Sequence, residues 1–406
     1  MRAYTHASEI LTGAGVRAKK GRFVSEEDLG VIPDGALVYS LKKVHGVEVP
    51  DRILWVGATQ DLPKKWLKVP QVNLRGKKAI MPGLIDCHTH LIFAGDRAEE
   101  FAQRCAGASY QEIASRGGGI QATVRATRGS SEAQLLRLAS ERLKEMFRHG
   151  VRSVEMKSGY GLSIEAELKI LRVIPKLKKK FPQMTLISTF LGAHDFPKEH
   201  SQESYMELLI QEMLPVVARE KLAESCDVFI DQGYYTLSQG KRILSHAKKL
   251  GLDVRVHADE LSNTGATELA VELGALSADH LLKVSSSGIH VLAQSRTVAV
   301  LLPGTAFYLK ADHAPARELI DAGAQVALAT DYNPGTCVCL SLPLIMTLAA
   351  LYLKMSRAEI FAAVTWNAAC ALQLQSRKGT VEAGMDADVW VMPFSKFEES
   401  YYRFGW

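Results

Sequence analysis

Short apolar runs alternate with longer amphipathic stretches across residues 79–340 of the chain. The runs are continuously apolar, as expected for parallel strands that are covered on both faces. The stretches between them have helical spacing; one places Leu135 and Leu138 after the candidate cap Ser130-Ser131. Eight parallel strands with helical crossovers predict a (β/α)8, TIM-like barrel. The strands are predicted at 78–85, 153–156, 185–192, 226–230, 252–256, 277–281, 298–302 and 325–329.

The two ends of the chain have a different pattern. Short strand-like pieces at 36–41 and 52–56 are separated by turn residues, and residues 379–393 read as another turn and strand. These pieces predict a small composite β-sandwich domain that residues 1–77 and 375–406 build together. The barrel domain then spans 78–374, and the helical pattern over its last part, 342–374, is expected to close it.

Composition excludes several classes of protein. The chain has 406 residues, of which 47% are hydrophobic and 23% charged, as in a globular enzyme with a large core. The net charge is +5, but basic runs such as 176–180 carry no interleaved aromatic residues, so we expect no nucleic-acid partner. No apolar run has membrane-spanning length, and Met1 to Gly15 lacks the apolar core of a signal peptide, so we expect a cytoplasmic protein without a membrane partner.

The six cysteines are scattered along the chain and show no disulfide framework. Cys337 and Cys339 could bind a soft metal, but a single C-x-C pair is weak evidence. Free thiols in a reducing compartment are the favoured interpretation.

His88-Thr89-His90 follows the first predicted strand. Residues two apart on a strand point to the same face, so the two imidazoles form half of a metal site. Other predicted strand ends carry His257, His280 and Asp331, and chemistry in such barrels gathers at these ends. Each residue also has an ordinary structural explanation, because a single histidine is often a buried polar side chain and Asp331 begins a good turn sequence.

Three imidazoles and a carboxylate can bind one first-row metal ion, which would activate a water molecule and polarise a carbonyl group. Glu260, three residues beyond His257, could move the proton. The joint pattern favours the metal site over separate structural roles.

These residues resemble the amidohydrolase superfamily over nearly the whole chain. The resemblance rests on the opening Pro-Gly-Leu-Ile-Asp-Cys-His-Thr-His at 82–90, on His257, His280 and Asp331, and on the closing stretch 384–389. Within the superfamily, five local motifs are similar to the imidazolonepropionase family. They lie at 93–97, at 109–113 with 117–120, at 157–162, at 192–194 and at 331–336.

The resemblance implies a function and a set of site residues. The family hydrolyses the cyclic amide of 4-imidazolone-5-propanoate to N-formimidoyl-L-glutamate, in histidine degradation. The resemblance also implies one zinc or iron ion per subunit and a homodimer. The implied metal ligands are His88, His90, His257 and Asp331. The implied substrate-binding residues, with Tyr110 expected in the same pocket, are Arg97, Tyr110, Tyr160, His194, Glu260, Asn333, Gly335 and Thr336.

The chemistry of the substrate agrees with these roles. An arginine fork matches a carboxylate, so Arg97 is the expected anchor for the propionate tail. We expect water activated by the metal to attack the ring carbonyl, with His280 helping to stabilise the oxyanion. Either Glu260 or Asp331 accepts the water proton, and one of them delivers it to the leaving nitrogen. The residues alone do not decide between the two carboxylates.

Three alternatives stay open at this point. Another cyclic-amide or amidine hydrolase, such as a deaminase, would share the metal site but would not need Arg97, Tyr160 and His194. A catalytically inactive scaffold would use the barrel as an interaction surface, although such relatives usually lose ligands. Lys157, at the end of a predicted strand, could be carboxylated and bridge two metals, whereas the family resemblance implies one metal.

Overall fold

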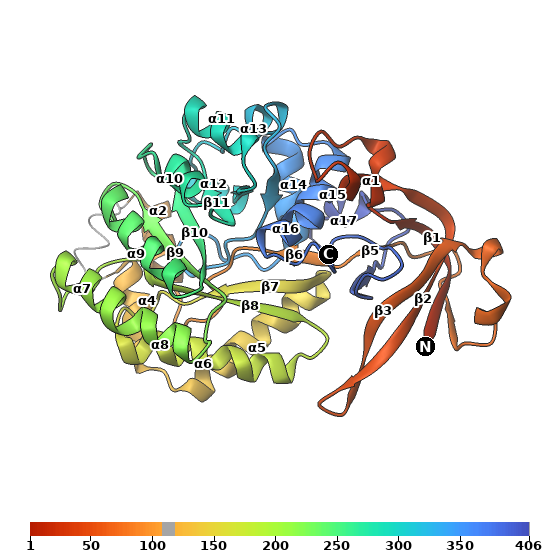
Figure 1. The fold of residues 1–406 in the computed structure, drawn as a ribbon, viewed down its shortest axis with the longest axis horizontal. Coiled ribbons are helices and arrows are strands. Elements are labelled where there is room, and N and C mark those ends of the chain that lie inside the picture. The colour runs from red at the N-terminus through yellow and green to blue at the C-terminus, as the bar shows by residue number, and fades with distance from the viewer. Residues whose placement is uncertain (108–117, 406) are drawn as a thin grey trace.

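A computed structural model describes residues 1–107 and 118–405 (Figure 1). Eight parallel strands follow one another in chain order around a barrel, which confirms the predicted fold. The ring closes where Thr89 forms a parallel bridge with Tyr332. There the amide of His90 donates to Tyr332 (2.9 Å) and the amide of Asp331 donates to His88 (3.0 Å). The strands are β6 (Leu84–Asp86), β7 (Val151–Lys157), β8 (Thr185–Ala193), β9 (Ser225–Ile230), β10 (Asp253–Ala258), β11 (Ser277–His280), β12 (Val298–Leu301) and β13 (Val326–Leu328).

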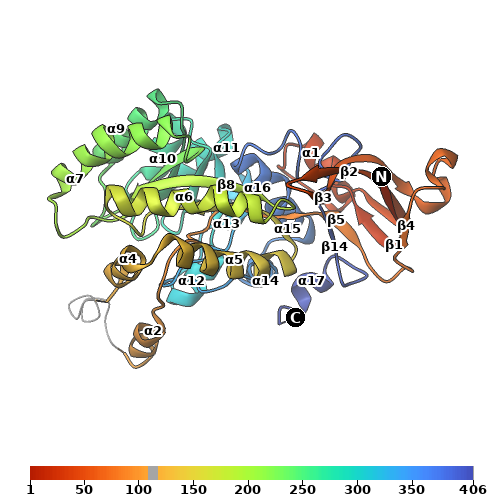
Figure 2. The same ribbon diagram turned by 90° about the horizontal axis from the view of Figure 1, so that it is seen from below.

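Helices surround this barrel and cover its outer face (Figures 1 and 2). The capping prediction is confirmed, because Ser131 accepts a hydrogen bond from the amide of Gln134 and begins a helix. A π-helical turn (Leu209–Met213) lies between the α-helices Gln202–Leu208 and Leu214–Arg219. The crossover and loop helices are α2 (Ala98–Cys105), α4 (Ile120–Gly129), α5 (Glu132–Arg148), α6 (Ile164–Lys180), α7 (Gln202–Leu208), α8 (Leu214–Arg219), α9 (Leu237–Lys249), α10 (Ala266–Glu272), α11 (Ser286–Gln294), α12 (Pro303–Leu309) and α13 (Ala316–Asp321).

The last part of the barrel domain is helical, but it is divided into three helices rather than one. Lys354 has a positive φ of 52°, and Thr365 leaves the helical region with φ −126° and ψ −90°. Each of these residues ends a run of regular backbone hydrogen bonds. The three helices are α14 (Leu342–Tyr352), α15 (Arg357–Val364) and α16 (Trp366–Ala371).

Both ends of the chain contribute to a second sheet beside the barrel (Figure 1). Its long hairpin turns at His45 and Gly46, which both have positive φ, as a type I′ turn requires. The composite β domain is therefore confirmed, and its six strands are hydrogen-bonded into one mixed sheet. They are β1 (Arg2–Leu11), β2 (Val31–Val44), β3 (Val47–Ala58), β4 (Gln71–Asn73), β5 (Ile80–Pro82) and β14 (Val389–Val391), with short helices α1 (Ala14–Ala18) and α17 (Glu399–Tyr402) beside it.

The first predicted strand, 78–85, needs a correction, because it is two strands that belong to different sheets. β5 joins the terminal sheet and β6 opens the barrel, with Gly83 between them. The amide of Gly83 donates to Asp388, whereas the next amide, of Leu84, donates to Gly150. A Cβ on Gly83 would lie 2.4 Å from the Arg152 side chain, so this crossing requires glycine. The terminal sheet thus extends past the predicted boundary at residue 77.

Two expectations about the whole chain concern membranes and thiols. No helix within residues 1–107 and 118–405 combines the length and the apolarity needed to cross a membrane. All six cysteines are free. Cys337 and Cys339 belong to neither of the potential metal-binding groups that the described residues form.

Candidate metal centre and pocket

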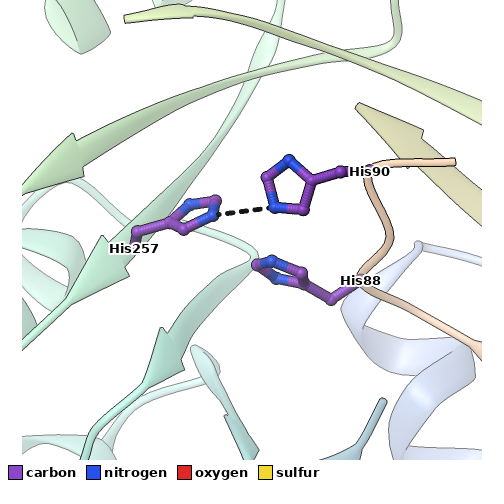
Figure 3. Close-up of side chains that lie close together, drawn as sticks. All are labelled: His88, His90 and His257. Atoms are coloured by element: carbon purple, nitrogen blue, oxygen red, sulfur yellow. Dashed lines mark hydrogen bonds between the residues drawn. The ribbon is translucent and has the colours of Figure 1, made fainter. Parts of the chain in front are cut away.

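Three strand ends bring the four expected metal ligands together at one mouth of the barrel. His88 and His90 follow β6, His257 lies in β10 and Asp331 follows β13. The ring nitrogens Nε2 of His257 and His90 are 3.4 Å apart, and Figure 3 shows the three imidazoles converging from two sides. Asp331 Oδ1 lies 3.5 Å from His88 Nε2 and 3.4 Å from His90 Nε2.

These separations fit a metal ion. Ligand bonds of about 2.0–2.1 Å in a tetrahedron place neighbouring ligand atoms about 3.3–3.4 Å apart. His88 Nε2 and Asp331 Oδ1 are buried and have no hydrogen-bond partner among the described residues, which would be costly without a ligand between them. The groups able to hold a cation within the described ranges are His88-His90-His257 and His88-His280-Asp331. The site is therefore suited to a metal ion.

Carboxylates behind the histidines set which ring nitrogen faces the site. His88 Nδ1 lies 2.6 Å from Asp279 Oδ2, and because that carboxylate accepts the proton, Nε2 keeps its lone pair for the site. His257 Nδ1 lies 3.0 Å from Asp227 Oδ2, close enough for an ion pair. Burial lowers the pKa of His88 and of His90 well below the usual value, and neutral imidazole is the form that binds metal.

His257 differs from the other two ligands. Burial would lower its pKa, but the charge of Asp227 and the hydrogen bond to it outweigh burial and raise the pKa. Burial also opposes ionisation of Asp227, yet His257 and Lys157 lower the pKa of this carboxyl group below its usual range. His257 and Asp227 thus favour each other's charged form, which puts a proton on both ring nitrogens of His257. A metal ion bound at Nε2 would displace the proton from that nitrogen.

Lys157, considered from the sequence as a bridge between two metals, lies below the site instead. Its ammonium is fully buried and contacts Asp227 Oδ2 (2.7 Å) and Glu155 Oε1 (3.0 Å). Burial would lower its pKa, but the surrounding carboxylates outweigh burial and raise it. Carboxylation requires a neutral amine, so this environment disfavours a carboxylated Lys157 as a metal ligand.

Asp331 and His280 are held in unusual backbone conformations. Both have positive φ, 51° for Asp331 and 80° for His280, a region that residues other than glycine seldom occupy and that recurs at functional sites. Thr305 donates to Asp331 Oδ2 at 2.6 Å, so Oδ1 is the oxygen left for the site. Burial lowers the pKa of His280 to about 3, so its ring is neutral and able to donate one hydrogen bond.

Glu260 reaches the same space from the loop after β10. Its Oε2 lies 3.6 Å from His280 Nε2. Asp231 accepts hydrogen bonds from the backbone amides of Glu260 (2.9 Å), Leu261 (2.8 Å) and Ser262 (3.1 Å), so one buried carboxylate fixes this loop. Burial, followed by the charge of Asp331, raises the pKa of Glu260 to about 8. A carboxyl group with a pKa near neutrality can both release and accept a proton.

A pocket of about 300 Å³ opens above these groups. All the site residues expected from the sequence line it, except the deeply buried His88 and Tyr110, which lies outside the described residues. Its walls combine apolar side chains with charged groups. The lining residues are His90, Arg97, Glu100, Arg104, Ile120, Tyr160, His194, Phe229, Tyr234, His257, Glu260, Leu261, His280, Leu309, Asp331, Asn333, Gly335 and Thr336.

Arg97 lies flat against the backbone of Gly335 at the outer part of the pocket. A Cβ on Gly335 would sit 1.3 Å from the Arg97 Nη2, so only glycine leaves room for the guanidinium. The Nε of Arg97 is buried and has no hydrogen-bond partner among the described residues. Within the part of the chain that the structure describes, its ion-pair partner is Glu100, at the long distance of 4.0 Å. Arg97 therefore retains donors for an anionic group in the pocket.

Asn333 and His194 use their polar atoms in different ways. The Asn333 Oδ1 accepts the amides of Gly335 (2.9 Å) and Thr336 (2.7 Å), so its side chain chiefly builds the turn. His194 Nδ1 donates to the carbonyl of Gly159 (3.1 Å), because a carbonyl can only accept. The other ring nitrogen of His194 is then an acceptor. Burial lowers its pKa well below the usual value.

Several residues of this site were missed from the sequence. Asp227 lies inside β9 and Asp279 inside β11, and Asp231 directly follows β9. A carboxylate inside an apolar strand is rarely left buried without a partner, and that was the available signal. Arg104, whose Nη2 donates to the carbonyl of Gly335 (3.1 Å), gave no signal, because its helix lies far from the turn in sequence.

Comparisons with known proteins place the chain in a family. The amidohydrolase family model matches residues 79–401. The imidazolonepropionase of Symbiobacterium thermophilum is 46% identical over 390 residues, covering 95% of this chain and 89% of that protein. That of Bdellovibrio bacteriovorus is 45% identical, covering 94% and 88%, and that of Geobacillus kaustophilus is 42% identical, covering 98% and 93%.

Solved structures share the fold at much lower identity. A. niger ochratoxinase superposes with a TM-score of 0.68 at 16% identity, covering 99% of this chain and 91% of that one. A guanine deaminase from C. acetobutylicum with bound guanine superposes with a TM-score of 0.66 at 15% identity, covering 99% and 95%. From the family model and the close relatives, this chain belongs to the amidohydrolase superfamily and, within it, to the imidazolonepropionase family.

Proposed function

We propose that the chain hydrolyses the ring amide of 4-imidazolone-5-propanoate and releases N-formimidoyl-L-glutamate. The observation that carries the proposal is one pocket with a metal-binding cluster at its base and, farther out, an Arg97 Nε that has no hydrogen-bond partner among residues 1–107 and 118–405. Its relatives at 41–46% identity carry the name imidazolonepropionase. At about 300 Å³, the pocket suits a small molecule rather than a polymer.

The substrate has two ends that need different partners. Its propionate tail is anionic, and the Arg97 guanidinium offers donors in the planar fork that matches a carboxylate. Its ring carries N–H groups, and the free ring nitrogen of His194 accepts one of them. Tyr160, whose pKa burial raises, stays a neutral hydroxyl donor at the pocket wall. With the tail at Arg97 and the ring at the base, the ring carbonyl lies next to the histidine cluster.

His88, His90, His257 and Asp331 would hold one zinc or iron ion per chain. Three imidazole nitrogens and one carboxylate oxygen suit either metal. The bound ion supplies Lewis-acid chemistry, which makes a water molecule more acidic and polarises the ring carbonyl. Elemental analysis of the purified protein tests the stoichiometry. A ratio near one metal per chain is expected, and a ratio near two contradicts the single site.

The remaining side chains move the protons. Water adds to the ring carbonyl carbon, and the bond from that carbon to the ring nitrogen then breaks. Glu260 and Asp331 are the two carboxylates that can accept the water proton. Glu260 has its pKa raised to about 8, so its carboxyl group still carries a proton near neutral pH and can deliver it to the leaving nitrogen. His280, neutral and 3.6 Å from Glu260, is placed to donate to the developing oxyanion.

The deciding experiment follows the loss of 4-imidazolone-5-propanoate spectrophotometrically, before and after dialysis against a chelator. We expect turnover that the chelator abolishes and that zinc or iron(II) restores. The matched comparison is the same ring with a neutral propanamide tail, which should lose most of kcat/KM because Arg97 loses its anion. Equal turnover of the neutral analogue, or faster turnover of purine or pyrimidine bases, would replace this proposal with a deaminase or another amidohydrolase.

A further inference from the structure

A cluster of buried charges lies beneath the histidines and touches none of the pocket. At its centre the Lys157 ammonium contacts Asp227 (2.7 Å), Glu155 (3.0 Å) and, at the longer distance of 3.9 Å, Asp279. All four side chains have 0% exposure. Lys157 lies in β7, Asp227 in β9 and Asp279 in β11, so the cluster crosses the inside of the barrel from three strands.

Each of the three carboxylates also holds a segment that carries a metal ligand. Asp279 accepts the proton of His88 Nδ1 at 2.6 Å. Asp227 accepts the amide of His257 at 3.2 Å, while its other oxygen lies 3.0 Å from that ring.

Glu155 acts on the backbone between the first two ligands. Its Oε2 accepts the amide of Thr89 at 3.1 Å, and its carbonyl accepts the Thr89 hydroxyl at 2.6 Å. Since Thr89 lies between His88 and His90, this carboxylate fixes the strand end that presents both imidazoles. The three carboxylates together therefore hold all three histidine ligands.

Three carboxylates this close in a water-free interior repel one another and lose solvation, so they need a cation among them to stay ionised. Arg255, another fully buried cation of this layer, donates hydrogen bonds to Ser225, Ser277 and the carbonyl of Ala371, none of them a carboxylate. Lys157 is thus the cation that bonds directly to this carboxylate cluster.

We propose that Lys157 is a positioning residue of the metal centre: its ammonium holds together the three carboxylates that aim the histidine ligands, so the chain's affinity for metal depends on a side chain that is not a ligand. This inference rests on the metal-dependent function proposed above. In this role Lys157 does not bind metal, unlike a carboxylated lysine that bridges two metal ions. Its ammonium acts on the histidine ligands through Asp279, Asp227 and Glu155.

The test compares two matched variants, Lys157→Met and Arg255→Met, by measuring zinc affinity of the chelator-treated protein in competition with a chromophoric chelator. For Lys157→Met we expect zinc to bind about 10- to 100-fold more weakly, as when a group behind a ligand is lost. Arg255→Met removes a buried cation from the same barrel layer and is expected to lower thermal stability while zinc affinity stays close to that of the wild type. Equal losses of affinity in the two variants, or none in Lys157→Met, would overturn the proposal.

A double-mutant cycle keeps the test decisive if Lys157→Met folds poorly. The cycle adds Asp279→Asn and the double variant Lys157→Met/Asp279→Asn. The double variant removes a carboxylate along with the ammonium, so it leaves less uncompensated charge than Lys157→Met. If Lys157 acts through Asp279, the double variant loses little further zinc affinity relative to Asp279→Asn alone, a comparison that does not need the single Lys157→Met variant. Fully independent effects would contradict the proposal.

A spectroscopic measurement distinguishes positioning from general packing. The proton of His88 Nδ1 in its short bond to Asp279 should give a far-downfield NMR resonance in the wild type, which Lys157→Met shifts or broadens and Arg255→Met retains. Wild-type protein that binds zinc without hydrolysing imidazolonepropanoate would refute the proposed function alone. Unaltered zinc affinity and an unaltered resonance in Lys157→Met, with normal wild-type turnover, would refute this inference alone.

Discussion

The base and the outer part of the pocket are built by opposite means. The base, formed by His88, His90, His257 and Asp331, collects side chains from strands that are far apart in sequence, and buried carboxylates or hydroxyls hold most of them. The outer part, Arg97 against the turn at 333–336, is held by short-range bonds within that turn. Residues fixed by the barrel strands can keep their positions when the sequence of a surface turn changes. We therefore infer that the base determines the reaction and the outer part determines the substrate.

The largest effect is expected at the base. His88→Ala removes a ligand and leaves Asp279 buried without its partner, so metal and activity should be lost together. Metal content and turnover of imidazolonepropanoate are measured on the same preparation. His290→Ala, at an exposed histidine on α11, is the control and should retain both. An active His88→Ala protein without metal would show that the base does not determine the reaction.

The next effect separates the proton carrier from the ligands. Glu260→Gln keeps the shape of the side chain but cannot exchange a proton, so kcat should fall by about 10²- to 10⁴-fold while the metal stays bound. The pH profile reports the direction of transfer. If Glu260 donates its proton, wild-type activity falls as the pH rises through the pKa of Glu260, and the variant lacks this limb. Full kcat in the variant would leave Asp331 as the proton carrier.

The sequence could place the candidate ligands at one mouth of the barrel because their signals were local, and the family resemblance then selected the set of four. His88 and His90 are two residues apart at a strand end, and the strand ends of a parallel barrel meet at one mouth, so His257 and Asp331 could be placed without coordinates. The carboxylates that orient them could not be placed in this way. Which side of the barrel interior Asp227 and Asp279 face depends on strand register, which long-range packing decides.

The boundary between the two sheets shows the same limit. Residues 78–85 form one apolar run, and two buried strands of different sheets look the same as one long strand when only hydrophobicity is read. Gly83 was the local signal, since a glycine inside a strand often marks a close approach of another chain segment. The homodimer, which the family resemblance implied, stays a prediction, as does the role of Tyr110.

A smaller effect is expected from the outer part of the pocket. Gly335→Ala places a methyl group where the Arg97 guanidinium lies. The displaced Arg97 side chain should then bind the carboxylate of the substrate tail more weakly. We expect kcat/KM to fall about 10- to 100-fold, chiefly through KM, with metal content unchanged. Gly129→Ala, where a Cβ meets nothing within 4 Å, is the matched control. A fall in kcat with an unchanged KM would mean that this turn also shapes the base.

The smallest effect tests whether the loop of Glu260 belongs to the base or to the outer part. Asp231→Asn places an amide NH₂ against backbone N–H groups that now donate to a carboxylate, which should cost about 1–3 kcal/mol of folding free energy and lower kcat about tenfold as Glu260 shifts. Ser262→Ala removes the hydroxyl bond to the same carboxylate, leaves the backbone bonds in place, and should keep kcat. Chemical denaturation and steady-state kinetics measure the two effects. A fall in kcat with unchanged KM would show that Glu260 takes part in the reaction together with the base. A change confined to KM would assign its loop to substrate selection, and the base would then consist of the metal ligands alone.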